Sequence, residues 1–266
     1  MTEARLPVVA GFPEFWQQVY DTYPLFFAAA ERLASLQNKI LRKPVREALP
    51  KLLRRIAITV SNSFGAVITL ALNGYGNDAM KIARGMFEAE LTAAHLRNHP
   101  EGVQDYMDFQ FVSEKRMLDY LKDFAPEMLS RIPSERVAEV EQRFEAVSPR
   151  FRGQNRWTKK TIREMAQDAG LIQPYLTVYS WASSMHHLDV IGLSTQVARE
   201  TFDVDVAPSQ EWLDLALLTG HGAVIHTLSH LDEAAGLGMD REIQAAVEEF
   251  KKAWQIPKAS GLTGSV

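Results

Sequence analysis

The sequence lacks cysteine altogether in its 266 residues. This absence excludes a disulfide framework, a zinc site built on thiolates and a cysteine nucleophile, and it is typical of a cytoplasmic protein. A secretory signal is not apparent either, because Glu3, Arg5 and Pro7 interrupt the short apolar run near the start. We therefore expect a cytoplasmic protein whose chemistry, if any, uses other side chains.

The chain also lacks a strong excess of charge of one sign, because its formal net charge is only −4. The whole molecule consequently has no general attraction to nucleic acid or to anionic lipid. The charge is nevertheless uneven. Residues 39–55 hold seven basic side chains against Glu47, and residues 150–163 hold six basic side chains and no acidic one.

Alternating runs of β-branched residues are scarce, whereas helical periodicity covers nearly every long segment. The sequence predicts an all-α fold: a single-domain bundle of about eight helices over residues 1–258, with a disordered tail at 259–266. The first helix is expected from Pro13 to Gln37 with a kink at Pro24. Thr158 is expected to cap a helix that ends at Gly170.

Three segments carry almost no charge: residues 56–77, 172–187 and 215–231. They predict three uncharged central helices wrapped by amphipathic ones. The first is long enough to cross a membrane. Ser61, Asn62 and Thr69 dilute its hydrophobicity, so we expect a buried helix and no membrane partner.

The helix expected near residues 77–97 places Arg84 and Glu88 on one face, together with Asn77 and His95. On a solvated edge, Arg84 and Glu88 would form an ordinary surface ion pair. In the interior, the same pair must be hydrogen-bonded and can orient a substrate or a catalytic base. Both alternatives stay open.

Two further observations favour the interior alternative. Glu90 and Arg97 lie on the opposite side of this helix and can supply its solvated face. Gly85 costs helix stability, which indicates close packing beside Arg84.

A second group lies on the segment 172–187, where Tyr179, Ser183 and His186 share one helical face. His186 would act as a general acid and base, with Tyr179 and Ser183 positioning the reacting group. The alternative is that the histidine is structural, because a residue near the end of a helix readily finds carbonyl partners.

His226 and His230 are four residues apart on one helical face, and Glu233 follows one turn later. Two histidines and a carboxylate suit a divalent metal ion. The segment lacks the H-E-x-x-H pattern, so core or surface histidines are the alternative. No other cofactor is predicted.

The basic loop near residues 150–163 interleaves aromatic and cationic side chains, a composition that grips phosphates and stacks on bases. A solvated loop between helices is the alternative. The residues that would contact a phosphate-containing ligand or RNA are Arg150, Arg152, Arg156, Trp157, Lys159 and Lys160.

Two motifs carry a resemblance to a known family. They are A-R-G-M-F-E within residues 77–106 and Y-S-W-A-S-S-M-H-H within residues 179–194. With its R-x-x-x-E and S-x-x-H segments, the chain resembles a bacterial family of helical proteins classed as a domain of unknown function. That resemblance implies a helical fold and no particular reaction.

The chain is also similar in general character to the HEPN class of helical domains, many of them toxins or phage-defence ribonucleases. Those proteins cleave RNA without metal through an R-x4-6-H motif, in which the arginine holds phosphate and the histidine moves the proton. This motif is absent here, so Arg84 and His186 would have to reproduce the pair across two helices.

Three functional hypotheses follow. The first is metal-independent acid/base chemistry on RNA or a nucleotide in defence or toxin biology, with a site formed by Arg84, Glu88, Tyr179, Ser183 and His186. The second is a non-enzymatic interaction or scaffold protein that self-associates as a homo-oligomer. The third is a metal-dependent hydrolase that uses His226 and His230.

Overall fold

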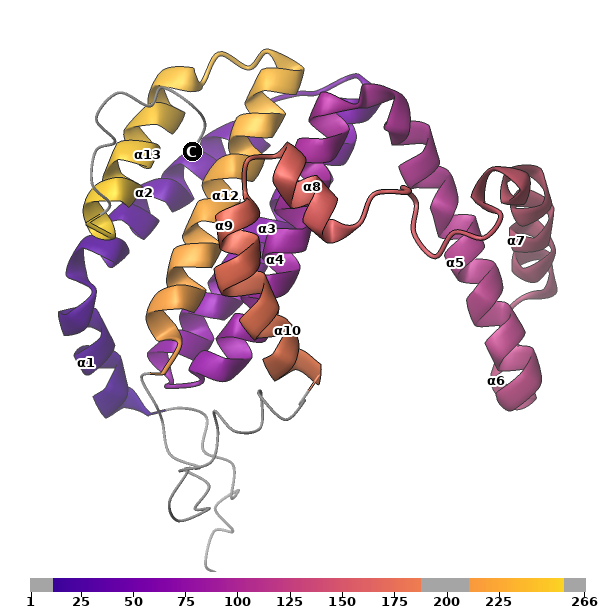
Figure 1. Ribbon diagram of the computed structural model, residues 1–266, viewed down its shortest axis with the longest axis horizontal. Coiled ribbons are helices and arrows are strands. Elements are labelled where there is room, and N and C mark those ends of the chain that lie inside the picture. The colour runs from indigo at the N-terminus through magenta and orange to yellow at the C-terminus, as the bar shows by residue number, and fades with distance from the viewer. Residues whose placement is uncertain (1–11, 188–210, 256–266) are drawn as a thin grey trace, which may run out of the picture. The chain divides into compact units, whose positions relative to one another are not determined.

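The computed structural model describes residues 12–187 and 211–255, and all regular secondary structure in those residues is helical (Figure 1). The helices are α1 Pro13–Thr22, α2 Pro24–Leu41, α3 Ala48–Leu72, α4 Gly76–Asn98, α5 Val103–Phe124, α6 Pro126–Leu129, α7 Ser134–Val147, α8 Ile162–Asp168, α9 Ile172–Pro174, α10 Ser180–His187, α12 Leu213–Ala235 and α13 Asp240–Ala253. Two 3-10 helices, η1 Pro100–Gly102 and η2 Ser148–Phe151, and a π-helix, η3 Tyr175–Tyr179, complete the order.

The predicted all-α class is confirmed for the described residues, but they contain more helices than the eight expected. One reason is Pro24, which ends a helix where the sequence suggested only a kink. Tyr23 leaves the helical region with φ −123° and ψ 47° and separates α1 from α2. A residue before proline avoids the α conformation because the proline ring crowds its backbone.

The start of α8 also differs from the prediction, because Thr161 caps the helix in place of Thr158. The Thr161 Oγ accepts a hydrogen bond from the Glu164 amide at 3.2 Å, and the Glu164 carboxylate accepts one from the Thr161 amide at 2.7 Å. This reciprocal pair is a capping box. It satisfies two amides that a helix otherwise leaves unpaired, and so α8 begins only at Ile162.

The described residues divide into two compact units. One contains residues 12–97 together with 165–187 and 211–255, and the other contains residues 98–164. The single-domain prediction is therefore not confirmed. The predicted tail at 259–266 lies outside the described residues.

The first unit is organised around α12, which packs along α3, while α13 packs against α2 and α12 (Figure 1). The interior face of α12 is apolar, with Leu217, Val224 and Leu228 fully buried. Gly220 faces the neighbouring helices, and a Cβ at this position would lie 3.0 Å from the Phe64 ring and 3.5 Å from the Met86 methyl group. The absent side chain therefore lets α12 lie close to Phe64 of α3.

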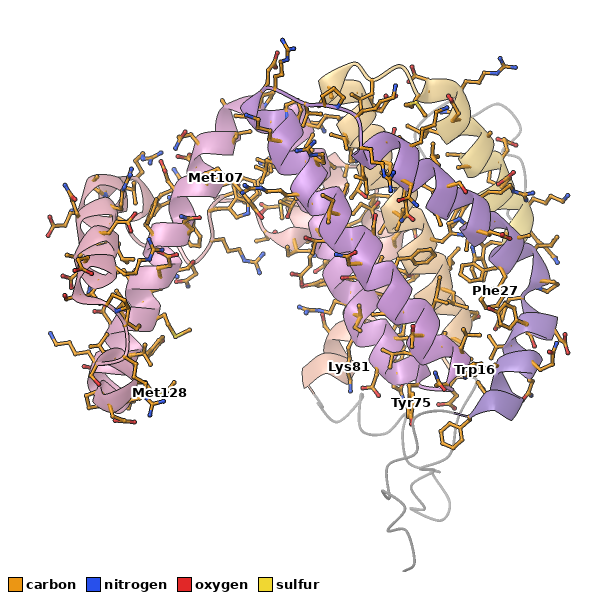
Figure 2. All side chains as sticks on the ribbon, turned by 180° about the vertical axis from the view of Figure 1, so that it is seen from behind. Trp16, Phe27, Tyr75, Lys81, Met107 and Met128 are labelled. Carbon is orange, nitrogen blue, oxygen red and sulfur yellow. The ribbon has the colours of Figure 1, made fainter. Side chains whose placement is uncertain are left out.

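Helix α1 is fixed to the end of α3 by one amide side chain. The Asn73 Oδ1 accepts hydrogen bonds from the Phe12 amide at 3.0 Å and from the Trp16 indole at 2.9 Å. The Phe12 ring also lies 6.3 Å from the Tyr75 ring, and Figure 2 labels Trp16 and Tyr75 at this end of the unit. A buried amide with several partners holds α1 in place although α1 itself buries few side chains.

Only one of the three uncharged segments forms the centre of the unit. Helix α12 is buried along its length, but only 33% of the most apolar window of α3 is buried. On η3 and α10, Leu176 and Trp181 are exposed. Tyrosine, serine and threonine tolerate water without a formal charge, and so absence of charge predicted burial poorly in the segment 172–187.

Among the described helices, α3 is the one long and apolar enough to cross a membrane by length and composition. Its buried face, which includes Leu53, Val60 and Val67, packs within the bundle. Packing of α3 against α12 accounts for this buried face, whereas most of the apolar window lies outside it.

The second unit consists chiefly of α5 and α7 packed against each other. Its core is small and contains Val112, Val147 and Phe151, with partly buried aromatic rings around them. Arg136 on α7 donates two hydrogen bonds to the Glu114 carboxylate on α5, at 2.9 and 3.0 Å. This exposed pair adds little stability, so the apolar core must hold the two helices together.

Two glycines of α4 give a matched prediction for stability. A Cβ at Gly76 would lie 1.9 Å from the Glu211 carbonyl oxygen, so Gly76→Ala should destabilise the protein by about 2 kcal/mol or more. Gly85 meets no described atom within 4 Å, so Gly85→Ala should stabilise it by about 1 kcal/mol through helix propensity. Chemical denaturation measures both, and equal stability of the two variants would contradict this account. The close packing predicted at Gly85 is absent among the described residues.

Candidate functional site

The side chains of Arg84, Glu88, Tyr179 and Ser183 form one hydrogen-bonded group, which we name the Arg84 cluster. The Arg84 Nε donates to the Ser183 hydroxyl at 2.9 Å, and the Arg84 Nη2 donates to the Tyr179 hydroxyl at 3.1 Å. The same Nη2 lies 2.9 Å from the Glu88 carboxylate, to which Tyr179 also donates at 3.0 Å. The cluster therefore joins α4 to η3 and α10.

The π-helix η3 supplies the tyrosine of this cluster. The Ser180 amide donates to the Tyr175 carbonyl five residues earlier, which widens the turn. Tyr175 and Tyr179 stack with centroids 5.2 Å apart, and the Arg84 guanidinium lies 4.9 Å from the centroid of the Tyr179 ring. Such π turns occur frequently at functional sites.

The cluster is half-buried, with the Arg84 side chain 18% exposed and the Glu88 side chain 35% exposed. Burial and the nearby Glu88 carboxylate raise the pKa of Tyr179, although Arg84 acts in the opposite direction. The phenol therefore stays protonated at neutral pH and donates its proton to Glu88 in a hydrogen bond. Among the described residues, none accepts a hydrogen bond from the Arg84 Nη1.

The structure brings together four of the five residues predicted for this site. Arg84 and Glu88 contact another helix, as in the interior alternative, although both retain some exposure. The fifth residue, His186, lies three residues after Ser183 in α10, and its side chain is outside the described part of the chain. Asn77, from the same face of α4, has a buried Oδ1 without a hydrogen bond from any described residue.

A second polar pair lies on the other side of α4 and was predicted wrongly. Glu90 was expected in the solvent but is only 3% exposed, and its carboxylate accepts a hydrogen bond from the His226 Nδ1. A signal was present in the sequence, because Glu90 is in phase with Ala83, Phe87 and Ala94, all of them buried. Burial lowers the pKa of His226, but the charge and hydrogen bond of Glu90 outweigh it and raise the pKa overall.

The predicted metal ligands have separate partners. His226 contacts Glu90, whereas Glu233 forms an ion pair with Arg97 and accepts a hydrogen bond from Ser229 at 3.2 Å. Burial, together with the charges of Arg97 and His226, lowers the pKa of His230 to about 3. The Glu90 carboxylate pairs with His226, and the Glu233 carboxylate pairs with Arg97. The predicted ligands His226, His230 and Glu233 therefore do not form one ligand set. Their contacts favour a role in joining α12 to α4.

His221 is a third histidine of α12 and lies among aromatic rings in the core. Its ring centroid is 5.5 Å from Phe26, 5.9 Å from Phe64 and 5.0 Å from Phe250. The residue is 1% exposed, and its Nδ1 has no hydrogen-bond partner among the described residues. Burial lowers its pKa to about 4, so the core contains a neutral imidazole.

The basic loop belongs to the second unit and is only partly available for a ligand. Arg150 forms ion pairs with Asp105 and Asp108, and Trp157 packs edge-on against Tyr106 with centroids 5.1 Å apart. Lys160 is half-buried. Four of the six predicted contacts are exposed, and besides the ion-paired Arg150 these are Arg152, Arg156 and Lys159.

The chain belongs to a family of unknown function, DUF5677, whose model matches residues 51–203. The matched segment runs from α3 through α10 and includes the whole Arg84 cluster, whereas α12 with His226 lies beyond it. No curated protein and no solved structure matches the chain. The predicted resemblance to a family of unknown function is thus confirmed, and the likeness to HEPN domains has no support.

The Glu90–His226 pair predicts a pH dependence. Because the folded-state pKa of His226 is raised, the pair stabilises the fold below the ordinary value of 6.5 and loses this contribution as pH rises through the raised pKa. In Glu90→Gln, burial acts alone, and the His226 pKa should fall below 6.5. Titration of the imidazole by NMR measures the pKa of His226 in the wild type and in the variant. A pKa unchanged by the substitution would contradict the pairing.

His221 predicts the opposite dependence. Its folded-state pKa is lowered from 6.5 to about 4, so the unfolded chain takes up a proton first as pH falls. As pH falls from 6.5 to about 4, the free energy of unfolding of the wild type should decrease by about 3 kcal/mol because of this histidine. His221→Leu should not show this decrease. Urea denaturation at pH 7, 5 and 4 measures the free energy of unfolding of both proteins. Parallel pH profiles would exclude a neutral, buried His221.

Proposed function

We propose that the Arg84 cluster binds the phosphate group of a nucleotide or of RNA, and that His186 transfers a proton there in metal-independent acid/base chemistry. One observation carries the proposal: Arg84 is oriented by Tyr179 and Ser183, which belong to the same helical segment as His186. A guanidinium held in this way loses little freedom when it binds an anion.

The charges and hydrogen bonds of the cluster determine which donors of Arg84 an anion can reach. Arg84 has five N–H donors, and the hydrogen bonds to Ser183 and Tyr179 use two of them. Glu88 balances the charge and competes with an incoming phosphate for Nη2. Because Glu88 is more exposed than Arg84, an anion that enters from solvent meets both groups, and Tyr179 remains a neutral donor.

The exposed residues of the basic loop, which belong to the second unit, are proposed as a separate phosphate contact. Arg152, Arg156 and Lys159 are the residues that would bind the backbone of a longer substrate such as RNA. Affinity through these residues should decrease with salt concentration. A cytoplasmic location belongs to the proposal as well, since the cysteine-free composition favours it.

The second candidate function is a non-enzymatic interaction or scaffold protein. It is favoured by the closed pattern of the cluster, in which Arg84, Glu88 and Tyr179 satisfy one another. Under this second candidate function, the sole role of the network is to fix η3 and α10 on α4. The two candidates therefore differ in whether Arg84 has a ligand besides Glu88.

The test compares three variants of α4 in binding of a fluorescent nucleotide and a short RNA. Arg84→Ala should abolish binding, whereas Glu88→Gln should tighten it about tenfold because the competing carboxylate is neutralised. Lys81→Ala, which removes another cation from the same helix, is the matched control and should bind as the wild type does. Tighter binding by Glu88→Gln is not expected of a purely structural network.

Catalysis is tested with His186→Ala and with the double variant Arg84→Ala, His186→Ala. In cells, the wild type should degrade RNA or arrest growth, and both variants should not. The purified wild type should keep its activity in EDTA. Binding without turnover in the wild type would leave the interaction hypothesis as the better account, and absence of both would contradict the proposed site.

A further inference from the structure

The face of α5 that turns away from its core carries a row of large apolar side chains with high exposure. Met117 is 59% exposed, Tyr120 63% and Phe124 80%, and Met128 on the adjoining α6 is also exposed at 53%. We name these four residues the α5 stripe. Figure 2 shows Met107 near the start of α5 and Met128 beyond its end.

The stripe follows the helical repeat. Met117, Tyr120 and Phe124 are spaced by three and four residues and therefore share one face, while Val112 and Leu118 on another face are buried in the unit. The rings of Tyr120 and Phe124 lie 6.4 Å apart. An exposed apolar surface of several hundred Å² marks an interaction site more often than an ordinary surface.

The charges beside the stripe identify the partner. Arg116 and Asp123 are exposed, lie on the same flank and are seven residues apart, which is about 10 Å along the helix. Met117 and Phe124 are also seven residues apart. If two α5 helices cross in antiparallel orientation at Tyr120, Arg116 of each chain meets the partner's Asp123, and Met117 meets the partner's Phe124. The surface is therefore complementary to itself, as a two-fold interface requires.

We propose that the protein forms a homodimer through the α5 stripe, with the two α5 helices antiparallel and centred on Tyr120. Methionine sulfur contacts the edge of phenylalanine favourably, and such an aromatic centre is typical of the residues that dominate binding energy. Arg116 already donates to the Gln154 carbonyl at 2.6 Å. Its remaining donors are sufficient for a carboxylate at the edge of the interface.

The first experiment measures the mass of the full chain in solution as a function of concentration, by analytical ultracentrifugation. The wild type should be a dimer, and Phe124→Glu should raise the dissociation constant by at least about thirtyfold, as for a central interface residue. Leu25→Glu, which places the same charge at an exposed leucine of the other unit, is the matched control and should leave the dimer intact.

The second experiment tests the antiparallel arrangement by exchange of charge. Arg116→Asp alone and Asp123→Arg alone should each weaken the dimer, because each sets like charges against each other. An equimolar mixture of the two variants should recover a heterodimer, in which both contacts join opposite charges. A monomeric wild type, a dimer that Phe124→Glu leaves intact, or no recovery in the mixture would each overturn the proposal. These outcomes are independent of the Arg84 cluster, because no residue is shared.

Discussion

The close approach of α12 to α3 and α4 is the constraint on which the first unit depends. Gly220 contributes on the α3 side, because a Cβ there would lie 3.0 Å from the Phe64 ring, whereas the Met86 methyl group on α4 would be at an ordinary contact distance of 3.5 Å. With α12 in this position, one face of α4 is buried and the opposite face is left for η3 and α10. Two polar groups of the unit, the Arg84 cluster and the Glu90–His226 pair, therefore occupy different sides of a single helix. Burial is deeper at Glu90, where the carboxylate has a cationic partner, as a buried charge requires.

The sequence was sufficient to predict the helical class and the grouping of Arg84 with Glu88, since both follow from the helical repeat. It could not decide between a solvated and an interior face, because that depends on which neighbour packs there. Glu90 shows the limit most clearly. A glutamate is seldom buried, so composition favours solvent, and only its position in phase with Ala83 and Ala94 indicates the interior. His226, its partner, is 136 residues away in the chain, and no local pattern connects the two.

The uncharged segments illustrate a related limit. Residues 56–77, 172–187 and 215–231 look alike in composition, but α12 alone is buried along its length. Tyrosine and serine lack charge, yet they hydrogen-bond to water or to a neighbouring side chain. In α10 and η3 these residues meet Arg84 instead of a core. The division into two units was equally hidden, because the connections at residues 98 and 164 carry no long linker of glycine and serine.

The π turn of η3 has a consequence for how this chain tolerates insertions and deletions. The turn accommodates one residue more than an α-helix does between Tyr175 and Ser180. Loss of one residue here would close an ordinary α turn and leave the residues that follow in about the same register. Restoring α pitch without that loss would rotate them by about 100° relative to Tyr175, and Ser183 would then leave Arg84. The alignment of α10 on α4 is therefore encoded by the length of one turn as much as by the identity of the residues in it.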